Sequence, residues 1–208
     1  MSSENKTVKE CIYLRHSTRN YLLNSGISED DLKEILNAGL QAPSSKNSQP
    51  WFYYIVEDRE RIVGVGKIME ETISAQIVEK INSKEPYNLL AMALETARII
   101  KTAPVLMIVC YEKKQHSDVK VGGVEKEHLF YESEMVDCMS IGASVQNMLL
   151  MAESLGIDSL WIADILTVQD EVCKYLKIEY QIISAVLFGK AAQSMRYRKS
   201  LEEKTKWI

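Results

Sequence analysis

The segment "RHSTR", residues 15–19, concentrates side chains that bind anions. Arg15 and Arg19 carry planar, permanently charged guanidinium groups that match the geometry of a phosphate. Ser17 and the threonine after it add hydroxyl donors, and His16 can donate a hydrogen bond or stack on a ring. A solvated basic turn is the competing interpretation, because cations are favoured at the C-terminal end of a helix. This segment alone does not decide between the two.

A second polar segment, "APSSKNSQPW", covers residues 42–51. Two prolines bracket three serines, an asparagine and a glutamine, directly before an aromatic run. Serine and asparagine are common in turns because they bond their own backbone, so a plain polar loop is one interpretation. The paired donors and acceptors of Asn47 and Gln49 could also read the edge of a heteroaromatic ring.

Near the C-terminus, "RYRKS" places Arg196 and Arg198 on either side of a tyrosine. Alternate residues of an extended chain share one side, so both arginines could face a single anion. A solvated basic tail is equally compatible with this segment. Taken together, the three segments predict one anionic ligand that also carries a ring.

The elements that would position these segments are mostly helices, with about four strands between them. Apolar residues at helical spacing, or in short β-branched runs, distinguish the two kinds of element. The expected helices cover 7–17, 28–42, 59–81, 88–101, 132–155 and 167–176, and the expected strands cover 51–57, 103–112, 159–163 and 182–189. This order predicts a sheet covered by helices.

Several helix ends are marked by their sequence. Thr7 followed by Glu10 matches a capping box, and Ser28 precedes a run of acidic residues that complements a helix dipole. Gly156 is expected to end the longest helix, and Thr167 to cap the last one.

The bulk composition is that of an ordinary globular protein. The 208 residues are 46% hydrophobic and 26% charged, with a net charge of −4, which favours a single domain over 1–208 and disfavours a general nucleic-acid binder. The four cysteines have neither disulfide-framework nor metal-site spacing, so we expect no metal. No secretory leader is evident, and no apolar run approaches the ~18 residues needed to span a bilayer, which predicts a cytoplasmic protein without membrane contact. The polar residues 113–130 are expected to form a surface excursion or lid.

"RHSTR" followed by "APSSKNSQPW" resembles the amino-terminal signature of the FMN-dependent nitroreductase family. "MVDCMSIGASVQNMLLMAESLGIDSLWIADI", residues 135–165, is similar to that family's central helix and following strand. "RYRKSLEE", residues 196–203, looks like its phosphate-binding end. The resemblance implies an α+β fold with a central, mostly antiparallel or mixed sheet flanked by helices, and a C-terminal extension exchanged in a homodimer.

The resemblance also implies roles for individual residues. The FMN phosphate, ribityl chain and pyrimidine edge would be held by Arg15, His16, Ser17 and Arg19, and the phosphate clamp would be completed by Arg196 and Arg198. The neighbouring subunit would contribute Pro43, Ser44, Ser45 and Asn47. The backbone near the isoalloxazine would come from Ile162 and Ala163. Gln146 and Asn147 are weaker candidates, since a central-helix position often serves packing. Either Asn82 or Asn88 could supply the family's middle flavin contact.

The implied activity is an FMN-dependent NAD(P)H oxidoreductase. FMN would take hydride from NADH or NADPH at N5 and pass it to a nitroaromatic, quinone or related acceptor in a ping-pong cycle, so that no side chain need act as the catalyst. Reductive dehalogenation or dehydrogenation on the same scaffold, and a flavin-binding redox sensor without turnover, are the alternatives. The sequence departs from the family at "WIADI", where many members carry Glu-Gly or Gly-Gly, and this leaves open which residue offers the backbone donor to N5.

Overall fold

A computed structural model describes residues 6–23, 25–113, 126–192 and 204–205, without the side chains of 126–133. Four strands form one antiparallel sheet with the order β1-β2-β4-β3. The strands are β1 (Trp51–Val56), β2 (Val105–Tyr111), β3 (Asp158–Ile162) and β4 (Gln181–Gly189). The predicted α+β class with a central antiparallel sheet is confirmed.

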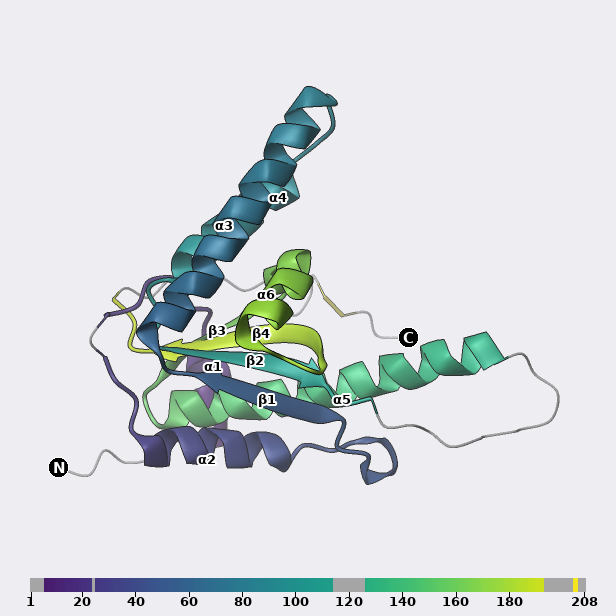
Figure 1. The fold of residues 1–208 in the computed structure, drawn as a ribbon. Coiled ribbons are helices and arrows are strands. Elements are labelled where there is room, and N and C mark those ends of the chain that lie inside the picture. The colour runs from purple at the N-terminus through teal and green to yellow at the C-terminus, as the bar shows by residue number, and fades with distance from the viewer. Residues whose placement is uncertain (1–5, 24, 114–125, 193–203, 206–208) are drawn as a thin grey trace.

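Helices cover both faces of this sheet (Figure 1). One layer holds α2 (Glu29–Leu40) and α5 (Lys126–Ser154), and the other holds α3 (Arg59–Asn82), α4 (Asn88–Ile100) and α6 (Gln169–Leu176). The central strand β2 is buried at every position. Its residues alternate between the two layers: Leu106 and Ile108 pack against α3 and α4, while Met107 and Val109 pack against α2 and α5.

The helices α3 and α4 form an antiparallel arm that projects well beyond the sheet (Figure 1). Near the sheet, Ile62 and Ile73 of α3 and Ala97 of α4 are fully buried in the core. Toward the tip, residues 81–89 are all exposed. The arm is therefore anchored by its base, and none of the described residues covers its far end.

The close packing of α2 on α5 depends on Gly39. A side chain there would place its Cβ 2.8 Å from Cγ of Met148 and 3.0 Å from Oγ of Ser144. The absence of a side chain lets the Ser144 hydroxyl donate to the Gly39 carbonyl over 2.8 Å. This contact fixes α5, the helix that packs beside β3, against α2.

Most predicted helix ends are confirmed. Thr7 and Glu10 form the capping box of α1 (Val8–Leu14), Ser28 accepts from the Asp31 amide at the start of α2, and Gly156 has a φ of 68° just after α5. Thr167 is not a cap. A 3-10 turn, η2 (Asp164–Val168), precedes α6, and the Thr167 hydroxyl donates to the Asp164 carbonyl over 2.8 Å.

Helix α5 begins at Lys126, six residues before its expected start at 132, and so includes the end of the predicted excursion 113–130. Residues 114–125 lie outside the described part. From Glu134 to Ser154 this helix has the length and composition of a membrane span, with a mean hydropathy of 1.2 and 44% of the stretch buried. Its inner face, including Ile141 and Met148, is fully buried against the sheet and α2, which accounts for its apolar composition.

Candidate functional site

The "RHSTR" segment leaves α1 and runs extended along the outer edge of β3. Ser17 forms a parallel bridge with Ser159, and the Thr18 amide donates to the Ser159 carbonyl over 3.0 Å. Side chains of an extended segment alternate in direction. Arg15 and Ser17 accordingly face the sheet surface beside α5, whereas His16 and Thr18 turn into the protein and are buried.

His16 is held by neighbours within the protein rather than presented to a ligand. Its Nδ1 lies 3.3 Å from the Leu14 carbonyl, and its Nε2 lies 3.4 Å from the Thr18 hydroxyl and 3.8 Å from a carboxylate oxygen of Asp158. The side chain of His16 therefore stabilises the conformation of the segment. Tyr21 lies near the same carboxylate. Burial, and secondly the charge of Asp158, raise the pKa of Tyr21 well above its ordinary value, so this phenol stays neutral.

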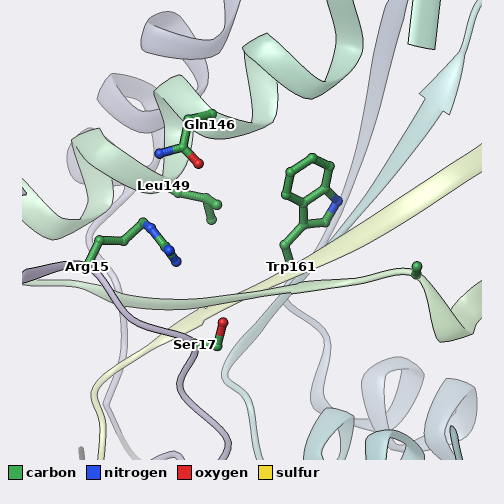
Figure 2. A pocket seen from close by; sticks show the side chains of 6 residues that line it. Arg15, Ser17, Gln146, Leu149 and Trp161 are labelled. Carbon is green, nitrogen blue, oxygen red and sulfur yellow. The ribbon is translucent and has the colours of Figure 1, made fainter. Parts of the chain in front are cut away.

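A cavity of about 280 Å³ lies between this segment, β3 and α5 (Figure 2). Arg15 and Ser17 approach it from the N-terminal segment, and Trp161 stands over it from β3. Its lining consists of Arg15, Ser17, Gln146, Leu149, Trp161 and Ala163. A cationic fork, a hydroxyl and an amide thus share one cavity with an indole ring and a leucine, which suits a ligand that combines an anionic or polar part with a flat ring.

The end of β3 presents its residues to different environments. Trp161 is 44% exposed on the cavity side, whereas Ile162 is 3% exposed and points into the opposite core. Ala163 is exposed and lines the cavity. The turn that follows is tied to the arm, because the Thr96 hydroxyl of α4 donates to Asp164 over 2.5 Å.

Of the central-helix candidates, Gln146 lines the cavity and Asn147 does not. The Asn147 amide donates to the Ala38 carbonyl of α2 over 3.2 Å, which is a packing role. Leu149 and Trp161 were not among the predicted site residues. A large apolar side chain that alternates out of a buried strand was the available signal for Trp161, and Leu149 gave none, because its spacing is that of an ordinary core residue.

The remaining predicted residues that the structure describes do not line the cavity. Arg19 is exposed and donates to the Ser17 carbonyl over 3.3 Å. Pro43, Ser44, Ser45 and Asn47 lie around the 3-10 turn η1 (Ser45–Asn47), next to the N-terminal half of α5 and before β1. Asn82 and Asn88 are exposed at the tip of the arm. Arg196 and Arg198 fall outside the described residues.

Within the described ranges, no group of three or more His, Cys, Asp or Glu side chains is arranged to hold a metal ion.

The protein-family model described as "Nitroreductase family" matches residues 12–190, which include the cavity and all four strands. The chain belongs to the Nitroreductase family. A family member from Archaeoglobus fulgidus, named "Putative NADH dehydrogenase/NAD(P)H nitroreductase", is 30% identical over 158 residues, which cover 74% of this chain and 68% of that protein. The resemblance inferred from the sequence motifs is therefore confirmed.

Solved structures show the same fold. A BluB-like flavoprotein from Clostridium difficile 630 matches with a TM-score of 0.80 at 22% identity, covering 98% of this chain and 99% of that chain. A nitroreductase with bound FMN from Bacteroides fragilis matches with a TM-score of 0.70 at 25% identity, covering 98% of each chain. The nitroreductase fold thus extends over nearly the whole protein.

Proposed function

We propose that this Nitroreductase-family protein is an FMN-dependent NAD(P)H oxidoreductase, which reduces a nitroaromatic, quinone or related acceptor in a ping-pong cycle. The observation that carries the proposal is the cavity between "RHSTR", β3 and α5, which is lined by Arg15, Ser17 and the indole of Trp161. Support comes from the relatives, whose names include NAD(P)H nitroreductase, and from the structural neighbour that holds FMN.

The chemistry of the lining fits this cofactor. The Arg15 guanidinium provides positive charge and parallel N–H donors for an anionic group, and Ser17 adds a hydroxyl on the same side of the segment. The Gln146 amide can both donate to and accept from the edge of a heterocycle. Trp161 and Leu149 supply an apolar wall for a flat ring. Buried Ile162 anchors the end of the strand, so that Ala163, which lines the cavity, would present its backbone to the ring.

When bound, FMN supplies the hydride-transfer chemistry between NAD(P)H and the acceptor. The protein's part is to bind, orient and charge-balance it. Arg15 would favour the negative charge of the cofactor, and donors fixed beforehand by the fold need not reorganise during the reaction. His16 would act indirectly, by fixing the segment that presents its two neighbours. Arg196 and Arg198 remain the proposed phosphate clamp, and Arg19 a further cation nearby.

The same site is proposed to be completed by a second copy of the chain. A cavity of about 280 Å³ lies just below the range typical for cofactor sites, roughly 300–1,000 Å³. The segment with Pro43, Ser44, Ser45 and Asn47 lies apart from the cavity of its own chain, as expected if it serves the neighbour.

Exposed apolar side chains on α1 and α5 offer a surface for that neighbour. On α1 they include Val8, Ile12 and Tyr13, which are 72%, 55% and 75% exposed, and on α5 they include Met135 and Met139, which are 48% and 69% exposed. Such surfaces commonly mark protein contacts. We propose a cytoplasmic homodimer with FMN at the subunit interface, without membrane or nucleic-acid partners.

The first experiment is the visible absorption spectrum of the purified protein, before and after anaerobic addition of NADH or NADPH. We expect a flavin spectrum that bleaches and recovers on addition of a nitroaromatic or a quinone. A colourless protein that takes up no added FMN would refute the proposal. A flavin that neither nucleotide reduces would favour the sensor, and recovery only with a halogenated substrate would favour dehalogenation. Light scattering should give twice the mass of one chain.

A further inference from the structure

The turn between α2 and β1 has an unusual backbone. Lys46, Asn47 and Gln49 have φ angles of 52°, 55° and 46°, so three residues with side chains occupy the left-handed region within four positions. Asparagine tolerates this conformation, whereas lysine and glutamine adopt it at a cost. Such a backbone persists only where its surroundings enforce it, and clusters of this kind are found at functional sites.

Two kinds of contact hold the turn in place. Within the turn, the backbone amide of Gln49 donates to the Ser44 hydroxyl over 3.0 Å, and the backbone amide of Asn47 donates to the Ser44 carbonyl over 3.1 Å. Toward the body of the protein, the Ser48 hydroxyl donates to Oδ1 of Asp137 over 3.3 Å. The bond from Ser48 connects the turn to α5, 89 residues further along the chain.

Asp137 is a buried carboxylate with 4% of its surface exposed. Its second oxygen, Oδ2, accepts from the Tyr111 hydroxyl over 3.0 Å, and burial raises the pKa of Tyr111 so that this phenol remains a donor. Among the described residues, no ion pair includes Asp137. A buried carboxylate needs donors for both oxygens, and here one oxygen is assigned to the strand β2 and the other to the turn.

We propose that Asp137 is a positioning residue that acts through Ser48 to hold Lys46, Asn47 and Gln49 in their left-handed form and so aims Ser44, Ser45 and Asn47 at FMN. This inference rests on the proposed function, in which those three residues contact the cofactor of the neighbouring subunit. The Tyr111 hydroxyl bonds to the other oxygen of the carboxylate, so the strand β2 helps to fix the position of Asp137 and thereby of the turn.

The test uses Ser48→Ala, which removes the tether and leaves Asp137 and Tyr111 intact. We expect the Kd for FMN, titrated into flavin-free full-length protein, to rise by about tenfold, the effect of losing one bond to a charged group. Ser48→Thr keeps a hydroxyl and should restore the affinity. The matched control is Ser140→Ala. This change removes a buried hydroxyl of α5, the helix that carries Asp137, and this hydroxyl donates to the Val136 carbonyl.

A second readout is independent of FMN. Opening of the turn favours tryptic cleavage after Lys46, so flavin-free Ser48→Ala should be cut there faster than wild type and faster than Ser140→Ala. In the double variant with Asp137→Ala, the two losses in FMN affinity should fall short of additive, because each change alone already removes the contact between Ser48 and Asp137.

Unchanged FMN affinity in Ser48→Ala, or an equal loss in Ser140→Ala, would overturn the inference. A wild-type protein that binds no FMN would instead refute the proposed function, so the two failures are distinguishable.

Discussion

Replacement of Trp161 tests whether the cavity holds a ring. The indole is 44% exposed, and a tryptophan side chain has roughly 250 Å² of surface, so about 110 Å² is available to a ligand. Complete coverage would contribute about 2.7 kcal/mol at ~25 cal/mol per Å². A flat ring lying on one face would cover about half, which gives about 1.4 kcal/mol, or tenfold in Kd.

The expected result is therefore a Kd for FMN about tenfold weaker in Trp161→Ala than in wild type. Trp161→Phe retains a smaller ring and should lose about two- to threefold. The assay is titration of FMN into flavin-free protein, followed by the change in flavin fluorescence. Chemical denaturation of the same flavin-free samples checks that the fold is intact.

Tyr175→Ala provides the matched control, because Tyr175 is 43% exposed on α6 and does not line the cavity. If Trp161→Ala and wild type bind FMN equally well, the indole does not contact the ring. If Tyr175→Ala loses as much affinity as Trp161→Ala, the effect comes from general destabilisation. The first outcome would refute the assignment of this cavity as the ring site, and the second would refute the attribution of the lost affinity to the indole.

Three further predictions concern the elements around the site. Gly66→Ala would put a Cβ 2.9 Å from the Ala97 carbonyl oxygen, between α3 and α4. The free energy of unfolding, measured in urea, should therefore fall by about 1–3 kcal/mol. An unchanged free energy would mean that the two helices can move apart to accommodate the methyl group. Thr96→Val removes the hydroxyl donor to Asp164 and should cost about 1–3 kcal/mol, whereas Thr96→Ser should not; an equal loss in both would indicate lost packing instead. The pKa of Glu10 is lowered by the Thr7 amide and then by its hydroxyl, so this carboxylate stabilises α1 above its ordinary pKa of 4.5, and the contribution is lost as the pH falls through the lowered folded-state pKa. NMR titration should show a higher Glu10 pKa in Thr7→Ala than in wild type, because the variant loses the hydroxyl bond and keeps the bond from the backbone amide; the same pKa in both would refute the contribution of the hydroxyl.

Local sequence signals predicted much of the fold because they correspond to local physics. The capping box of Thr7 and Glu10, and the left-handed Gly156, depend on residues a few positions apart, and both are confirmed. Thr167 failed as a cap because the chain first makes a 3-10 turn, in which this hydroxyl bonds to Asp164. A choice between these two turns depends on how the segment packs, which no short window of sequence contains.

The site was predicted less completely, for a related reason. Membership of the family pointed to "RHSTR", but only the pairing of Ser17 with Ser159 determines which of its side chains face the cavity. The helical residue Leu149 joins the lining because α5 passes beneath that strand, which is a tertiary fact. The role of Asp137 depends on two contacts to residues 89 and 26 positions away.

One register controls the composition of the cavity. Because "RHSTR" and β3 are both extended and lie side by side, each contributes alternate residues to each face. A slip of one residue in the first segment would replace Arg15 and Ser17 by His16 and Thr18, and a slip in β3 would replace Trp161 by Ile162. The buried contacts of His16 with Thr18 and Asp158 oppose the first slip, and the burial of Ile162 opposes the second. The residues that turn away from the cavity thus determine which residues line it.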